Sequence, residues 1–180
     1  MNPIITMKNI SFIYDCLEKK QKIIENLSFE IFHNEIVSIV GPEKCGKSTI
    51  LSLICGIIEP TNGYISCKNT HIGYMVQNGD IFQWHNVYRN FSKTYNNIPE
   101  KYIHSSFIPL NDNCCKINSC NNYCQKKAAL IKTLSSDPDL LLLDEPFSSF
   151  DLDSRIEIRN EIISLIHKEQ KSAIFISTNL

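Results

Sequence analysis

The chain has 180 residues, which is enough for one domain with a sizeable hydrophobic core. Its hydrophobic fraction of 43% and charged fraction of 21% are typical of a globular protein, and its formal net charge of -1 provides no basic field for nucleic acid. No apolar run approaches the roughly 20 residues that cross a bilayer, and the first residues do not resemble a secretory signal, so we expect no direct membrane insertion.

The N-terminal part of the chain predicts an antiparallel pair of strands. Residues 9–14 alternate between apolar and polar, with Tyr14 on the apolar face, and residues 26–31 alternate in the same way. The charged stretch between them, residues 15–22, is predicted to be a turn. The following residues 35–40 are nearly all apolar and β-branched, which indicates a buried strand of a parallel sheet.

A glycine loop follows this buried strand directly. It has the frame G-x-x-x-x-G-K-[ST], and a helix is predicted after it at residues 47–57. Strand, glycine loop and helix in this order form a phosphate-binding loop, in which backbone N–H groups and the helix N-terminus bind phosphate. The residues of this predicted nucleotide site are Gly41, Pro42, Glu43, Lys44, Cys45, Gly46, Lys47, Ser48 and Thr49.

The charged residues of the loop have opposing expected effects. Lys47 is expected to neutralise the β- and γ-phosphates, and Ser48 is expected to give its hydroxyl to Mg²⁺. Glu43 should repel the γ-phosphate, and Lys44 should offset part of that repulsion. If the backbone of Lys44 needs a positive φ, the strain costs about 1 kcal/mol. We therefore expect nucleotide binding to be weakened rather than abolished.

The middle of the chain is the least regular part. Strands are predicted at residues 62–66 and 71–76, whereas residues 86–122 are rich in Asn, Ser, Lys and Cys and predict short helices and loops. Four of the eight cysteines lie close together, at Cys114, Cys115, Cys120 and Cys124. Without a secretory signal they are expected to be thiols, and both a metal site and a role as small apolar fillers are open.

The last third of the chain alternates helices and strands. The predicted elements are a helix at 125–136, a strand at 140–143, an amphipathic helix at 154–169 and a strand at 172–177. Four leucines run into Asp144 and Glu145; Asp144 is suited to hold Mg²⁺, and Glu145 to polarise an attacking water. These elements predict an α/β fold with a mostly parallel sheet, formed as a single domain over residues 1–180.

At this point the sequence resembles a known family. The glycine loop, "IGYMVQ" and "DPDLLLLDEPFSSFD", in this order, are similar to the nucleotide-binding subunit of an ABC transporter. The stretch "IGYMVQNGDIFQWHNVYRN", including Trp84, most resembles importer ATPases of the nitrate, sulfonate and taurine type. The resemblance implies a P-loop NTPase core, an N-terminal antiparallel β subdomain and a helical subdomain, here at about residues 86–125.

The resemblance also implies roles for single residues. Tyr14 would stack on adenine, although a strand aromatic in the core is an equally open interpretation. Gln77 would touch Mg²⁺ and the attacking water and would sense the membrane subunit, and Asp151 would contribute to a dimer interface. The implied cofactors are ATP and Mg²⁺. The implied partners are a membrane permease subunit and another ABC ATPase subunit, in a homodimer or a heterodimer, peripheral on the cytoplasmic, inner face of the cell membrane.

The sequence departs from the family pattern in four places. Cys120-Asn121-Asn122-Tyr123 aligns with the signature L-S-G-G, so the serine and both glycines are replaced. Thr178 aligns with the switch histidine and cannot orient water as an imidazole does. The segment after Gln77 predicts a shortened helical subdomain, and the C-terminal end is expected to be missing relative to the family.

We therefore expect an ATP-binding subunit that couples ATP binding and hydrolysis to solute import, with weak ATPase activity. Two alternatives remain open. The chain could be a degenerate regulatory subunit that binds nucleotide without hydrolysing it, or a decayed fragment whose last strand lacks a covering layer.

Overall fold

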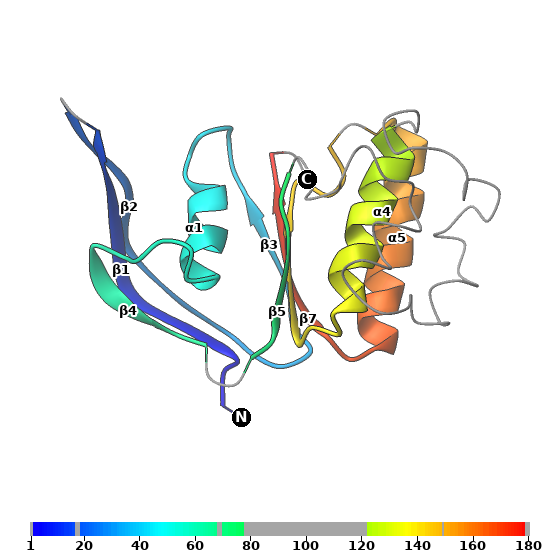
Figure 1. Cartoon of the computed structure of the whole chain (residues 1–180), viewed down its shortest axis with the longest axis horizontal. Helices are drawn as coiled ribbons and strands as arrows, with labels where there is room; N and C mark the ends of the chain where they lie inside the picture. Colours follow the sequence, from blue (N-terminus) through cyan, green and yellow to red (C-terminus); the bar gives the residue numbers. More distant parts are fainter. Residues whose placement is uncertain (1, 17–18, 68–69, 78–121, 149, 179–180) are drawn as a thin grey trace.

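The computed structural model of the chain describes residues 2–16, 19–67, 70–77, 122–148 and 150–178. The strands are β1 (Ile5–Cys16), β2 (Lys19–Ile31), β3 (Ile36–Val40), β4 (Asn62–Ser66), β5 (Ile72–Met75), β6 (Leu140–Asp144) and β7 (Ser172–Ser177). The helices are α1 (Lys47–Ile54), α4 (Asn122–Ser135) and α5 (Leu152–Lys168). They form layers: an antiparallel sheet, then α1, then a parallel sheet, then α4 and α5 (Figure 1).

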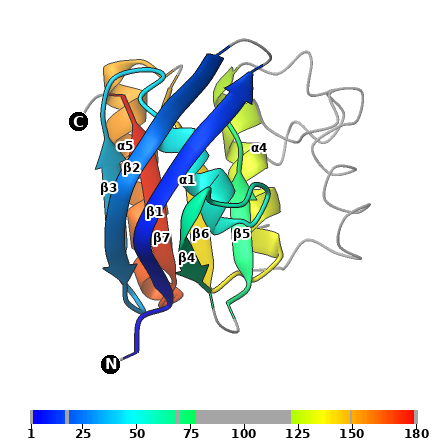
Figure 2. The same cartoon turned by 90° about the vertical axis from the view of Figure 1, so that its left-hand side faces the viewer.

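The antiparallel sheet has the strand order β2-β1-β4 and confirms the predicted N-terminal β subdomain. The predicted turn at residues 15–22 is wrong, because the ladder of β1 and β2 continues through most of it. Tyr14 lies opposite Gln21 and Asp15 lies opposite Lys20, so the opposite charges of this last pair face each other across the ribbon. Figure 2 shows the two strands running side by side past α1 as one long ribbon.

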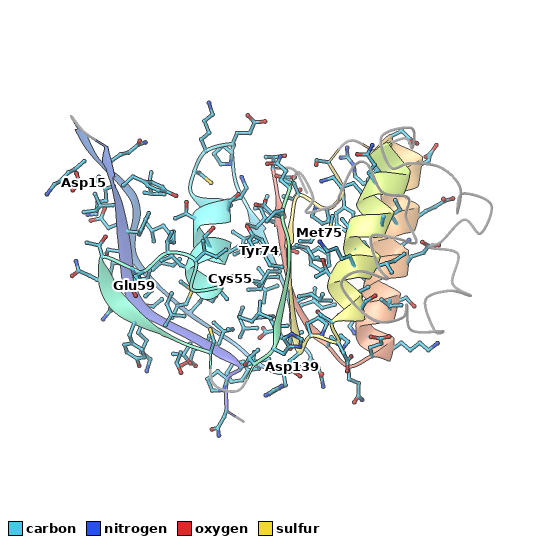
Figure 3. The ribbon with its side chains drawn as sticks, in the orientation of Figure 1. Asp15, Cys55, Glu59, Tyr74, Met75 and Asp139 are labelled. Atoms are coloured by element: carbon cyan, nitrogen blue, oxygen red, sulfur yellow. The ribbon has the colours of Figure 1, made fainter. Side chains whose placement is uncertain are left out.

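The second sheet has the order β3-β7-β6-β5, and all of its neighbouring strands are parallel, as predicted. Its central strand β6 explains the run of four leucines. Leu140 and Leu142 pack on the α1 side while Leu141 and Leu143 pack on the α4 and α5 side, so every position is buried. In β5 Tyr74 and Met75 likewise point to opposite faces of the sheet (Figure 3).

Helix α5 buries the stripe predicted from its sequence. Ile158, Ile162 and Ile166 are buried and Leu165 is partly buried against the sheet. Strand β3 is parallel to its neighbour, as predicted, but it is not fully buried. It is the end strand of the parallel sheet within the described residues, and Val40 is 42% exposed. None of the described helices is long and apolar enough to cross a membrane.

Much of the predicted helical subdomain lies outside the described residues. Of its residues 86–125, only the last four fall in α4. Cys114, Cys115 and Cys120 of the cysteine cluster also lie outside the description, as does Trp84.

Candidate functional site

The glycine loop connects β3 to α1, as the sequence predicts. Gly46 immediately precedes the helix with φ 100°, a left-handed conformation that glycine adopts without strain. A Cβ atom at this position would lie 2.7 Å from Ile23 Cγ2 of β2. Both the backbone angle and the contact with the ribbon therefore require glycine here.

Lys44 adopts a positive φ of 62°, so the condition for backbone strain in the loop is met. A lysine in this conformation costs about 1 kcal/mol or more relative to glycine. The side chains from Pro42 to Cys45 are exposed, which places Glu43 and Lys44 on the outer rim of the loop.

Lys47 folds back into the loop instead of pointing to solvent. Its Nζ donates hydrogen bonds of 2.7 Å to the carbonyl oxygens of both Gly41 and Pro42, and the residue is only 7% exposed. The ammonium group is thus held at the centre of the loop's curve. Ser48 beside it is exposed, whereas Thr49 is buried.

The parallel sheet brings the loop and the two acids to the same edge. In the strand register Val40 pairs with Ser177, and Asp144 pairs with Ile176. Because the strands are parallel, the carboxyl ends of β3, β7 and β6 meet there. Gly41 N donates to Ser177 O at 3.4 Å, and the N–H of Glu145 donates to Ile176 O at 3.2 Å, which extends the ladder into the site.

Asp144 and Glu145 are buried carboxylates with unfilled hydrogen-bonding capacity. They are 4% and 8% exposed, and within the described chain Asp144 Oδ1 and Glu145 Oε1 have no hydrogen-bond partner. A buried acceptor without a partner destabilises the fold, and a buried carboxylate does so most. Such a pair fits a bound cation, and oxygen ligands of this kind suit Mg²⁺. Glu145 also has φ 48°, a left-handed conformation.

Gln77 comes directly after β5 and reaches the site through its backbone. Its carbonyl oxygen accepts a hydrogen bond of 2.5 Å from Lys126 Nζ of α4, and Lys126 Nζ also donates to Glu145 O at 3.3 Å. The side chain of Gln77 is exposed. Sequence reasoning missed Lys126. The only available signal was a group of polar residues at the start of an otherwise apolar helix.

A known protein family matches most of the sequence that forms this fold. A comparison with protein-family models matches residues 24–148, more than half of the chain, to the family described as ABC transporter. The chain belongs to the ABC transporter family.

Curated ABC relatives cover nearly the whole chain. It is 31% identical over 98% of its length to a Fe(3+) ions import ATP-binding protein of Haemophilus influenzae, of which it covers 55%. It is 26% identical over 96% of its length to a taurine import ATP-binding protein of Ruegeria pomeroyi, of which it covers 71%. The chain thus spans little more than half of the iron-import relative. The match to a taurine relative agrees with the predicted resemblance.

The solved ABC structures support the fold. A dimeric ATP-binding cassette bound to ADP and Pi matches with a TM-score of 0.82 and 20% identity, covering 98% of this chain and 88% of that one. An inward-facing transporter described as a metal-chelate type ABC transporter matches with a TM-score of 0.79 and 21% identity, covering 98% of this chain and 74% of that one. The predicted P-loop α/β core is therefore confirmed.

Tyr14, where an ABC ATPase would stack adenine, is open to solvent. It is 43% exposed and meets Phe12 edge to face at a centroid distance of 4.8 Å, so its prediction as a core-facing residue is wrong. Tyr14 lies opposite Gln21 on β2, two residues from the Ile23 that adjoins Gly46. The exposed ring is therefore on the part of the ribbon nearest the loop.

The signature residues of the ABC alignment are only partly within the described chain. Cys120 and Asn121 lie outside it, and Asn122 and Tyr123 form the first turn of α4. Asp151, predicted to contribute to a dimer interface, is exposed immediately before α5.

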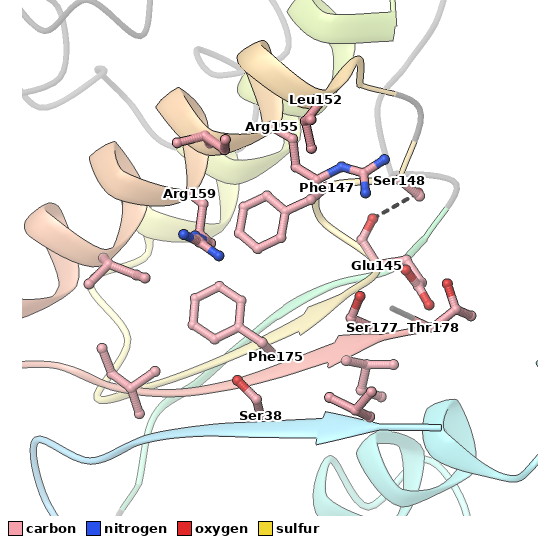
Figure 4. Close-up of a pocket in the computed structure, with 15 residues that line it drawn as sticks. Ser38, Glu145, Phe147, Ser148, Leu152, Arg155, Arg159, Phe175, Ser177 and Thr178 are labelled. Atoms are coloured by element: carbon pink, nitrogen blue, oxygen red, sulfur yellow. Dashed lines mark hydrogen bonds between the residues drawn. The ribbon is translucent and has the colours of Figure 1, made fainter. Parts of the chain in front are cut away.

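A cavity of about 540 Å³ lies on the α5 side of the sheet and shares Glu145 and Thr178 with the site (Figure 4). Its apolar wall includes Phe147 and Phe175, which stack at 5.7 Å. No residue of the glycine loop lines it, so it is separate from the place where the loop would bind phosphates. Thr178 therefore lies beside Glu145, where the ABC alignment puts the switch histidine.

Proposed function

We propose that this chain is the ATP-binding subunit of an ABC transporter, of the import type that its relatives' names describe. One observation carries the proposal. The ammonium of Lys47, held inside the glycine loop, lies at the same edge of one parallel sheet as the buried carboxylates of Asp144 and Glu145, each of which has one oxygen without a hydrogen-bond partner in the described chain. A cationic loop beside buried acids with free oxygen atoms suits a nucleotide whose phosphates carry Mg²⁺.

The residues of this edge divide the work of holding Mg-ATP. Lys47 and the loop N–H groups would bind the phosphates, and Ser48, Asp144 and Gln77 would hold the metal. Bound Mg²⁺ would neutralise phosphate charge as it develops. Within the described residues no group of three or more His, Cys, Asp or Glu side chains could hold a metal, and oxygen atoms of the nucleotide would contribute to the metal's ligands. Glu145 would then accept a proton from the attacking water.

We propose that turnover at this site is slow. Glu43 adds negative charge at the rim of the loop, and Thr178 offers no imidazole beside Glu145. The replaced signature at Cys120–Tyr123 offers few small residues for closing over the phosphates of a neighbouring subunit. An intact second ABC ATPase is therefore the partner that suits this chain, with a permease that holds both at the inner face of the membrane.

Thermal shift measurements with Mg-ATP test the binding proposal. The wild-type chain should gain stability with increasing Mg-ATP, because a ligand that binds only the folded state raises the melting temperature. Lys47→Ala should lose this gain. Lys168→Ala removes an exposed lysine from α5 and serves as the matched control, which should respond as the wild type does. An equal response in Lys47→Ala would mean that nucleotide binds elsewhere.

Glu145→Gln tests the proposed role in hydrolysis separately from binding. The amide keeps the size of the side chain but cannot accept a proton from water. The variant should retain the ATP-dependent thermal shift, lose phosphate release when assayed alone, and lower the phosphate release of a heterodimer with an intact partner ATPase. Unchanged phosphate release in this variant would refute the assignment of Glu145.

A further inference from the structure

Lys126 joins three segments that are far apart in the sequence. It lies on α4, and its ammonium donates to the carbonyl oxygen of Gln77 after β5 at 2.5 Å and to that of Glu145 after β6 at 3.3 Å. The side chain is half-buried and lines a small cavity together with Met75 and Phe150. A single side chain thus connects α4 with the ends of two strands, at the edge of the parallel sheet where the glycine loop and the two acids lie.

The turn at Glu145 depends on the groups that hold its carbonyl oxygen. A left-handed glutamate is strained and persists only where the surrounding structure fixes it. Its oxygen accepts three hydrogen bonds: from Ser148 N at 3.2 Å, from Ser148 Oγ at 2.9 Å and from Lys126 Nζ. Lys126 is the only one of these donors that comes from outside the turn.

The electrostatics around Lys126 agree with this arrangement. Burial lowers the pKa of Lys126, whereas the nearby carboxylates of Asp144 and Glu145 act in the opposite direction and favour its charged form. Lys47, the buried cation of the glycine loop, is bonded to that loop's own carbonyl oxygens. Lys126 is therefore a second positive charge near the two acids, in addition to Lys47.

We propose that Lys126 is a positioning residue that ties the backbones of Gln77 and Glu145 together and so sets the direction of both side chains before nucleotide binds. The proposal rests on the proposed function for its consequence in the Mg-ATP site. The tie itself is a property of the chain without nucleotide. Because α4 starts in the region aligned with the signature, any displacement of α4 would reach both residues through Lys126.

Hydrogen exchange of the nucleotide-free protein tests the tie directly. Lys126→Met keeps the apolar stem but removes the charge and both hydrogen bonds. The amide of Ser148 donates to Glu145 O within this turn, and the amide of Glu145 donates to Ile176 O of β7 beside it. Both amides should exchange roughly tenfold faster, which corresponds to about 1.4 kcal/mol. Lys126→Arg, which retains charge and donors, should stay within about threefold of the wild type. Lys132→Met makes the same change six residues further along α4 and should leave both amides unchanged.

A global loss of stability would accelerate exchange in every core strand, including the β7 amides, so faster exchange confined to residues 144–148 separates positioning from general unfolding. If the methionine variant does not fold, Lys126→Gln, which lacks the charge but keeps a donor, takes its place. The exchange rates of the Glu145 and Ser148 amides are then compared between this variant and the wild type. Equal exchange at Glu145 and Ser148 in all folded variants would overturn the proposal.

Titration of a fluorescent ATP analogue with Mg²⁺ tests the consequence. In Lys126→Met the concentration of Mg²⁺ at half-saturation should change at least threefold, while binding of the analogue without Mg²⁺ should stay close to that of the wild type. An unchanged Mg²⁺ midpoint would refute the influence of Lys126 on the metal site. Absence of binding in the wild type as well would instead count against the proposed function, and the exchange experiment would still decide the tie.

Discussion

Replacing Lys44 with glycine should stabilise the protein, because glycine relieves strain in the backbone at this position. Lys44 has φ 62° and an exposed side chain. A left-handed conformation costs a non-glycine residue roughly 1–2 kcal/mol. Glycine removes this strain but increases the entropy of the unfolded chain, which offsets about 0.4–1 kcal/mol. The expected net gain therefore lies between about 0 and 1.6 kcal/mol, with a midpoint of about 0.8 kcal/mol. For a domain of this length that corresponds to roughly 1–4 °C in melting temperature.

Two matched variants separate backbone strain from side-chain charge. Lys44→Ala removes the ammonium but keeps a Cβ, so it should melt close to the wild type. Glu43→Gly introduces glycine at the neighbouring position, which does not have a positive φ, and should therefore lower stability. Urea denaturation with and without Mg-ATP measures all three. Equal stabilisation by Lys44→Ala, or destabilisation by Lys44→Gly, would refute strain at this residue.

Three further predictions concern packing, thiol reactivity and the base of the nucleotide. Gly73→Ala should destabilise the fold by roughly 1–3 kcal/mol in urea denaturation, because the added Cβ would lie 2.9 Å from Pro138 Cγ; a neutral result would contradict the tight contact. At pH 8 iodoacetamide should label exposed Cys45 roughly tenfold faster than Cys55 at the end of α1 (Figure 3), since burial raises the pKa of Cys55 to about 11; peptide mass spectrometry should not give the reverse order. Tyr14→Ala should weaken the binding of a fluorescent ATP analogue by about 1 kcal/mol and leave the binding of inorganic tripolyphosphate unchanged. Equal losses of binding for both ligands would exclude stacking on the base.

The parallel sheet could be predicted because its signal is local and strong. The four leucines of β6 are apolar on both faces, and this pattern occurs where a strand is covered on both sides. The glycine loop was predictable for the same reason, since strand, loop and helix follow one another directly in the chain. Asp144 could then be placed at the edge of the sheet from its position at the end of that strand.

Other features depend on contacts that the sequence does not display. The ribbon of β1 and β2 continues through charged residues and places Asp15 opposite Lys20, whereas in the sequence a charged run resembles a turn. The exposure of Tyr14 follows from its place near the end of this ribbon. Lys126 escaped prediction because it binds carbonyl oxygens, and a backbone acceptor leaves no trace in the identity of the residue that carries it.

The position of β7 in the sheet has a consequence for the order in which the protein forms during synthesis. Strand β7 lies between β3, which leads into the glycine loop, and β6, which ends in Asp144. It is the last of the described strands in chain order, yet it is the one that sets the spacing between the lysine and the acids. A growing chain that has emerged only as far as Glu145, just after β6, already contains every residue of the loop and both carboxylates, but these have no fixed relation to each other. The long-range pairing of β3 with β7 must wait for translation to pass residue 177, so nucleotide would assist folding only after β7 is available.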